Sequence, residues 1–274
     1  MARLNAATEE VTAKLDVYEI GEAGRALESF TDDLSRWYIR RSRRRFQRPE
    51  PADLITASNT LRGVLLSLAK LIAPFAPFFA EGLYQSLGEG SVHLEDWLVT
   101  DKKTANKELL SAMEEIRKIS SDALALRAKF GIKVRQPLGK LSIKNKKLNI
   151  KDAAELLNII KEEVNVKEVV FDASIKDELE LDTNITPELA AEGLTREFTR
   201  LIQELRQTAD YKPGEEAQLF AELPPNLVSL FEERATVIRE EASLASIVWK
   251  RTDKFDAEAV TKLGESDVWL GIRR

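Results

Sequence analysis

The sequence contains no cysteine and a single histidine, His93. The absence of cysteine excludes disulfides, thiolate-ligated zinc, iron–sulfur clusters and a thiol nucleophile, and one histidine excludes a metal site built from several. Long apolar runs are also missing, since none approaches the ~20 residues that a membrane span needs. The N-terminal segment MARLNAATEE lacks the apolar core of a signal peptide. We therefore expect no metal, no bound cofactor and no membrane contact in this chain, and a place in the cytoplasm.

The composition is that of a folded protein. The 274 residues suggest about two domains, and the charged (32%) and hydrophobic (43%) fractions rule out a disordered or collagen-like chain. The chain has 41 lysines and arginines and 46 aspartates and glutamates, which gives a net charge of −5. That charge by itself argues against nucleic-acid binding. The basic residues are clustered, however, so the net charge conceals the local pattern.

Residues 1–130 are typical of amphipathic helices with short connections. Prolines and glycines mark the helix ends, because proline cannot continue the helical hydrogen-bond ladder. Apolar periodicity predicts helices over about 4–18, 23–46, 54–72, 78–87 and 106–129. Such helices with short connections indicate an antiparallel bundle.

The pattern changes after Gly131. Alternating segments predict short strands at 139–144, 164–171 and 178–183, with a helix at about 152–163. Thr186 and Pro187 then predict a helix start, as N-cap and first helical residue, and 225–242 indicates another helix.

The predicted fold class is therefore mainly α. We expect an antiparallel helical bundle over 1–130, followed by a small α/β (α+β) region over 131–274, in which a sub-boundary near 183 is an option. No internal repeat is apparent in the sequence.

The most informative segment is SRWYIRRSRRRFQR at 35–48. It has no acid and seven arginines: Arg36, Arg40, Arg41, Arg43, Arg44, Arg45 and Arg48. On an α-helix they cover about 200° of the surface, with Trp37 in the same arc and Tyr38, Ile39 and Phe46 facing the bundle. Guanidinium groups suit phosphate, and an indole can stack on a base or on a guanidinium. A polyanion would offset the repulsion among these charges; the alternative is a solvated face paired with acids such as Asp32 or Asp33.

Two further basic features follow. The stretch 127–147 lacks acids and includes Lys133 and Arg135, so it predicts either an extension of a nucleic-acid track or an ordinary exposed hairpin. A polar stripe opposite an apolar helix face contains Arg196, Arg200, Gln203 and Gln207. Arginine and glutamine can read base edges, although a solvated face is the simpler interpretation.

Nothing in the sequence marks a catalytic site. There is no G-x-x-x-x-G-K-[ST] phosphate loop, and the glycines at 21–24 and 88–90 are too sparse for a dinucleotide fingerprint. His93 lies near Glu95 and Asp96, which is more typical of a packed or capping histidine than of a general base. We assign no catalytic, cofactor-binding or metal-ligating residue.

Several segments together resemble the isoleucyl-tRNA synthetase family. Three segments are similar to the anticodon-binding helical domain of that family: FTDDLSRWYIRRSRRRF (30–46), LITASNTLRGVLLSLAKLIAPFAPFFAEGLYQSL (54–87) and SVHLEDW (91–97). FGIKVRQPLGKLSI (130–143) resembles the segment after that domain, and ELDTNITPELAAEGLTREFTRLIQELRQTADYKPG (180–214) resembles the C-terminal extension of the zinc-free form. Valyl-, leucyl- and methionyl-tRNA synthetases share the bundle, but the valine enzyme is expected to end in a coiled coil, and heptads are lacking here.

The resemblance implies a class I ligase that activates isoleucine with ATP, transfers it to tRNA and removes mischarged valine in an editing domain. The family's HIGH-type and KMSKS-type signatures are absent, since the histidine lies in SVHLE and the methionines are Met1 and Met113. We therefore expect the catalytic and editing domains, with ATP and magnesium, to lie upstream. On that expectation this chain is a C-terminal fragment or one half of a split enzyme.

On this interpretation the chain docks isoleucine tRNA near the anticodon stem and loop, with the catalytic and editing domains as its other partners. The candidate tRNA-binding residues are Arg36, Trp37, Arg40, Arg41, Arg43, Arg44, Arg45, Lys133, Arg135, Arg196 and Arg200. Phosphate contacts would position the RNA, and exposed loop bases would supply specificity. The alternatives are the equivalent part of valyl-tRNA synthetase, an orphan RNA-binding module without a catalytic partner, and a protein-interaction scaffold whose arginines face an acidic partner.

Overall fold

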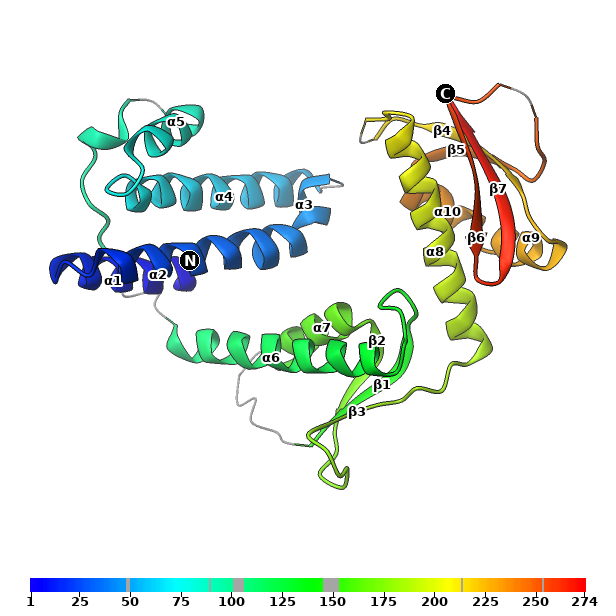
Figure 1. The fold of residues 1–274 in the computed structure, drawn as a ribbon, viewed down its shortest axis with the longest axis horizontal. Coiled ribbons are helices and arrows are strands. Elements are labelled where there is room, and N and C mark those ends of the chain that lie inside the picture. Colours follow the sequence, from blue (N-terminus) through cyan, green and yellow to red (C-terminus); the bar gives the residue numbers. More distant parts are fainter. Residues whose placement is uncertain (48–49, 89, 101–105, 145–152, 213, 253) are drawn as a thin grey trace. The chain divides into compact units, whose positions relative to one another are not determined.

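The computed structural model describes the whole chain except residues 48–49, 89, 101–105, 145–152, 213 and 253. The described residues form two compact units, Met1–Ser111 and Ala112–Arg274 (Figure 1). Helices predominate, and the sheets of the described residues lie in the second unit, so the predicted class of a mainly α chain ending in a small α/β region is confirmed. In the part of the chain that the structure describes, no helix combines the length and the apolar character needed to cross a membrane.

The first unit is a helical bundle. Its main helices are α1 (Ala2–Asp16), α2 (Ile20–Asp32), α4 (Pro51–Ile72) and α5 (Pro77–Leu87). Proline occupies the first turn of α4 and of α5, where no intrahelical hydrogen bond is lost. Leucines, alanines and Phe30 from α1, α2 and α4 form the core. Trp97 Nε1 donates a 2.9 Å hydrogen bond to Thr12 Oγ1, which ties the segment after the short helix η2 (Val92–Leu94) to α1.

Between α2 and α4 the chain forms a π-helical segment, η1 (Asp33–Ile39), and the short helix α3 (Arg43–Gln47). The sequence predicts one uniform α-helix here. A π-helical turn is wider than an α-helical turn, so it rotates the side chains that follow. Ile39, predicted to face the bundle, is 37% exposed, whereas Tyr38 packs against the core as predicted.

The helix α6 (Lys107–Lys129) lies largely in the second unit. The sequence pattern predicts a boundary at 130/131, but the structure divides at 111/112. The reason is that Ile116 and Ala123 of α6 are buried in one cluster with Leu138 and Leu141, which lie on a strand. The apolar face of α6 therefore covers a sheet instead of completing the bundle.

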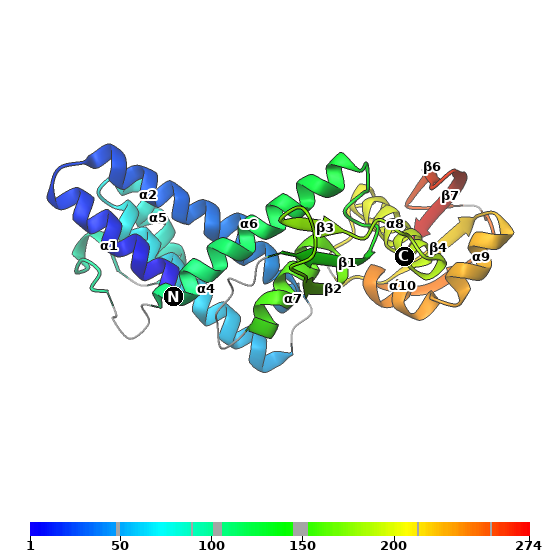
Figure 2. The ribbon, with the colours of Figure 1, turned by 90° about the horizontal axis from the view of Figure 1, so that it is seen from below.

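That cluster is the core of what we call lobe A (112–181). After α6 its elements are β1 (Leu138–Ile143), α7 (Ala153–Val164), β2 (Val166–Phe171) and β3 (Leu179–Leu181). The strand order is β2-β1-β3, with β1 parallel to β2 and antiparallel to β3 (Figure 2). The strands and the helix predicted for this region are confirmed.

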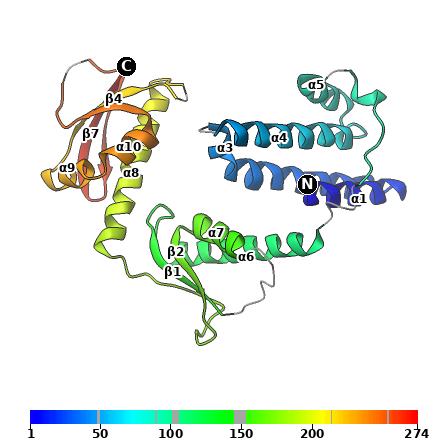
Figure 3. The same ribbon diagram turned by 180° about the vertical axis from the view of Figure 1, so that it is seen from behind.

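The rest of the second unit is lobe B (187–274). Its elements are α8 (Pro187–Thr208), β4 (Ala217–Glu222), α9 (Pro225–Glu232), α10 (Ala235–Ala242), β5 (Leu244–Val248), β6 (Ala257–Leu263) and β7 (Ser266–Arg273). The strand order is β5-β4-β7-β6, with β4 and β5 parallel. As predicted, Thr186 caps α8 by accepting a hydrogen bond from the Leu189 amide. Helix α8 packs against the sheet (Figure 3). Its residues Phe198 and Ile202 are buried in the core of the lobe.

Lobes A and B share one structural plan, although no repeat is apparent in the sequence. Each has a first helix (α6 or α8), two parallel strands joined through helical structure, and a strand antiparallel to the first (β3 or β7). Each also has a buried arginine, Arg127 or Arg206, eleven residues before its first strand. Only four of the 26 paired residues of 116–141 and 195–220 are identical, which explains why the sequence conceals the repeat.

The two arginines make similar hydrogen bonds. Arg127 donates to the carbonyl of Val164 at 3.1 Å, two residues before β2, and Arg206 donates to that of Ser243 at 3.0 Å, one residue before β5. Each also donates to the carbonyl two residues before its first strand. In both lobes the fourth residue after the arginine has a positive φ. The shared hydrogen bonds and backbone turns indicate a duplicated supersecondary unit.

Candidate nucleic-acid interface

The predicted arginines of the first unit lie on η1, on α3 and between them, where α2 and α4 are joined. Arg36, Arg40, Arg43 and Arg44 are exposed, and Arg41 and Arg45 are half-buried. Arg48 lies outside the described residues. The structure thus gathers exposed guanidinium groups on one short connection of the bundle.

Arg36 and Arg45 have carboxylate partners. Arg36 Nε lies 2.7 Å from Asp32, one helical turn earlier. Arg45 forms a bidentate pair with Asp53 on α4, with its Nε 2.9 Å from Oδ2. This hydrogen bonding raises the pKa of Arg45 and lowers the pKa of Asp53. Arg45 therefore joins α3 to α4, a structural task that the sequence does not reveal.

The guanidinium groups of two arginines lie against the ring of Trp37. The guanidinium carbons of Arg40 and Arg41 lie 5.8 and 5.7 Å from the ring centroid. These distances are those of cation–π contacts. Arg40 Nε also donates a 2.9 Å hydrogen bond to the Arg36 carbonyl, which orients its side chain. The predicted juxtaposition of the indole and the arginines is confirmed, and its use in stacking on a base stays a prediction.

In the second unit, Lys133 and Arg135 lie in the connection between α6 and β1. Both are exposed, and so is the ring of Phe130, at 54%. Arg127 supports this loop from inside the lobe by donating a 2.7 Å hydrogen bond to the Lys133 carbonyl. Burial lowers the pKa of Arg127, which is fully enclosed. Lys146 and Lys147, at the end of the predicted basic stretch, lie outside the described residues.

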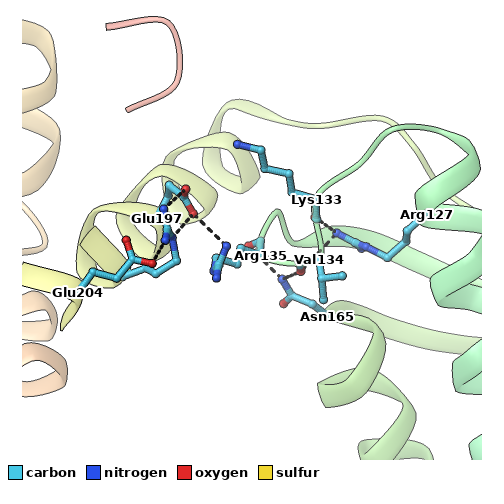
Figure 4. Close-up of polar contacts among 8 residues, drawn as sticks. Arg127, Lys133, Val134, Arg135, Asn165, Glu197 and Glu204 are labelled. Carbon is cyan, nitrogen blue, oxygen red and sulfur yellow. Dashed lines mark hydrogen bonds and ion pairs between the residues drawn. The ribbon is translucent and has the colours of Figure 1, made fainter. Parts of the chain in front are cut away.

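Arg135 and Arg200 converge on one carboxylate of α8. Arg135 Nη1 lies 3.5 Å from Glu197 Oε2, and Arg200 donates to Glu197 at 3.1 Å and also to Glu204 (Figure 4). Burial acts to raise the pKa of Glu197, but the hydrogen bond from Arg200 and the nearby positive charges outweigh it, so this pKa is lowered. Glu197 is thus ionised at neutral pH and offsets part of the local positive charge.

Arg196 also faces lobe A. It donates to Asn165 Oδ1 at 2.6 Å and pairs with Glu192 at 2.8 Å. Asn165, which has φ +56 between α7 and β2, donates its own amide to the carbonyls of Val134 and Arg135 (Figure 4). Arg196 of the predicted polar stripe therefore belongs to a seam between α8 and lobe A.

Gln136 and Lys167 complete this seam. Gln136 Nε2 donates to the Leu189 carbonyl at 2.8 Å, and Lys167 pairs with Glu192 at 2.6 Å. A Cβ on Gly193 would lie only 2.9 Å from Gln136 Cδ, so any other residue here would displace the end of the Gln136 side chain from its present position. We call Arg135, Gln136, Asn165 and Lys167 the lobe A seat.

Sequence reasoning missed Gln136, Asn165 and Gly193 as parts of one contact. A signal was present, because Gln136 lies in RQPL and Gly193 in the segment 180–214, both of which carry the family resemblance. What the sequence lacks is any sign that these two segments meet.

Residues 1–144 match the family model described as the anticodon-binding domain of tRNA ligase. The chain is similar to the isoleucine–tRNA ligase of Dehalococcoides mccartyi, at 34% identity over 90% of this chain and 27% of that protein. The isoleucine–tRNA ligase of Clostridium tetani is 35% identical over 76% of this chain and 20% of its own length. That of Pyrococcus abyssi is 28% identical over 94% of this chain and 32% of its own length. The chain thus spans between 20% and 32% of these curated relatives.

Proposed function

Because this chain belongs to the family of anticodon-binding domains of tRNA ligases, we propose that it binds the anticodon stem and loop of isoleucine tRNA as part of an isoleucine–tRNA ligase. The observation that carries the proposal is the exposed arginine segment on η1 and α3, inside the matched residues 1–144. Arginine presents a planar fork of donors that fits phosphate. Arg36, Arg40, Arg41, Arg43 and Arg44 are the phosphate contacts in this proposal, and Trp37 offers a ring for an unstacked base.

Lys133 and Arg135 extend the contact in the proposal. Their loop is exposed, it lies within residues 1–144, and Phe130 beside them offers a further aromatic ring. Arg196 and Arg200 would have to exchange carboxylate partners for phosphates. We therefore assign Arg196 chiefly to holding α8 against lobe A, and Arg200 to pairing with Glu197 and Glu204 on α8 itself.

Binding of three transcripts tests the proposal directly. The purified chain would be titrated with isoleucine tRNA, valine tRNA and isoleucine tRNA with a swapped anticodon, each at two salt concentrations. We expect a preference for isoleucine tRNA that the anticodon swap removes. Equal and steeply salt-dependent binding of all three would show that the surface contacts phosphates without recognising the anticodon. No binding at all would contradict the proposal and favour a protein-interaction scaffold.

We expect Glu197→Gln to raise the affinity for tRNA about two- to fivefold and to steepen its salt dependence, because it removes an ionised carboxylate beside Arg135 and Arg200. The amide keeps the size of the side chain and its hydrogen-bonding oxygen. Fluorescence anisotropy with labelled tRNA measures the change, and Glu222→Gln, an exposed acid on β4, is the matched control. Unchanged affinity for tRNA with an intact fold would show that Lys133 and Arg135 do not contact the tRNA.

The proposal places ATP, magnesium, isoleucine activation and editing in other parts of the ligase, and it places the chain in the cytoplasm. The residues of this chain do not fit a binding site for ATP or magnesium. The sequence has no phosphate loop, and among the described residues no group of three or more histidines, aspartates or glutamates could hold a metal ion. We therefore expect the purified chain to show no isoleucine-dependent exchange between ATP and pyrophosphate, with a full-length isoleucine–tRNA ligase as positive control. Robust exchange by this chain would overturn the assignment.

A further inference from the structure

The duplication in the second unit creates a second position equivalent to the lobe A seat. The lobe A seat lies where β1 and β2 begin, and the first half of α8 rests on it. In lobe B, where β4 and β5 begin, there is a hollow of about 420 Å³, whose lining includes Gly214, Glu216, Arg239, Glu240 and Ser243. We call these five residues the lobe B seat.

Backbone geometry establishes that the two places correspond. Asn165 of the lobe A seat has φ +56, and Ser243 of the lobe B seat has φ +52. The carbonyl of Asn165 accepts a 3.1 Å hydrogen bond from the Leu138 amide, and that of Ser243 accepts a 3.2 Å hydrogen bond from the Ala217 amide. Leu138 and Ala217 are the first residues of β1 and β4. The same turn therefore forms the floor of both seats.

We propose that the lobe B seat binds an α-helix of a partner polypeptide, in the way that the lobe A seat holds α8. The equivalent surface of the same chain is already covered by a helix, α8, which favours a helical partner here. Helices that dock in grooves present side chains three and four residues apart, and Glu192 and Arg196 of α8, which both contact the lobe A seat, have this spacing.

Charge defines the partner helix further. The lobe A seat is basic, through Arg135 and Lys167, and the helix it holds supplies the acids Glu197 and Glu192. In the lobe B seat, the position of Arg135 is occupied by Gly214, and the exposed charges are Glu216, Arg239 and Glu240. Two carboxylates against one guanidinium favour a helix whose docking face carries lysine or arginine. The same excess of carboxylates disfavours RNA phosphate at this place.

A charge-matched helix is the probe. It is a peptide with the sequence of residues 186–203, in which Glu192→Lys and Glu197→Lys supply the basic face, held helical by a staple on its opposite side. Binding to the full chain is measured by fluorescence anisotropy. Hydrogen exchange with and without the peptide reports which amides become protected.

We expect saturable binding that protects the amides of 236–244 and falls at least tenfold in Glu216→Lys/Glu240→Lys. The matched control, Glu232→Lys/Glu233→Lys, changes two other exposed acids of lobe B and should alter the affinity less than twofold. Absence of binding at millimolar peptide, or equal binding to the seat variant and the control, would overturn the proposal. Protection of 236–244 by tRNA and not by the peptide would also overturn it, because the seat would then be an RNA surface.

Discussion

The double variant Arg43→Ala/Arg44→Ala is expected to bind isoleucine tRNA about ten- to a hundredfold more weakly near 0.1 M salt. Both side chains are exposed on α3. Each phosphate contact releases a counterion, so losing two should lower the slope of log K against log salt by about 1.4 to 1.8. Titrations at several salt concentrations measure both quantities, and circular dichroism should show an unchanged fold.

The choice of residues and control matters for this experiment. Arg45 is kept, because its pair with Asp53 joins α3 to α4 and its loss would alter the turn as well as the charge. The control is Lys14→Ala/Arg25→Ala, which removes the half-buried Lys14 and the exposed Arg25 near the connection between α1 and α2, where they pair with Glu19 and Glu22. An unchanged salt slope in the α3 variant, or an equal loss of affinity in the control, would show that the arginine segment is not part of the tRNA interface.

The second large effect concerns stability. Arg127→Met should lower the free energy of unfolding of the second unit by about 3–5 kcal/mol. The guanidinium is fully buried and donates to the carbonyls of Val164, Lys133 and Gln136. Methionine fills similar volume but donates nothing, so each of these carbonyls loses a hydrogen bond. The loss should appear in urea unfolding and as faster hydrogen exchange at β1 and β2.

Lys133→Met provides the matched comparison, because Lys133 is exposed in the loop that Arg127 supports. We expect it to leave stability within about 0.5 kcal/mol of the parent. Arg206→Met should also destabilise, as the counterpart of Arg127 in lobe B. A loss below about 1 kcal/mol for Arg127→Met would show that water replaces the guanidinium, and that the hydrogen bonds of Arg127 do not stabilise the lobe.

Features that depend on neighbouring residues could be predicted from the sequence. Thr186 caps α8 and Pro187 is its first residue, as the sequence predicts, and the predicted breaks at Pro51 and Pro77 fall where α4 and α5 begin. Proline geometry and side-chain capping act within one turn of helix, so no distant contact is needed. The alternating strands of lobe A follow the same logic. The clustering of arginines over 35–48 is likewise visible without a fold, and it led to the proposed tRNA surface.

What only the tertiary structure decided is which surfaces meet. The amphipathic pattern of α6 does not say whether its apolar face covers a bundle or a sheet, and Ile116 is buried against the sheet of lobe A. The positions of Arg196 and Arg200 on α8 do not reveal that Asn165, Glu197 and Glu204 engage them. The duplication was hidden because backbone turns and a buried arginine preserve a fold while most side chains differ. Periodicity determines which face of an element is apolar, whereas its partner is chosen by burial and hydrogen bonding between residues far apart in the chain.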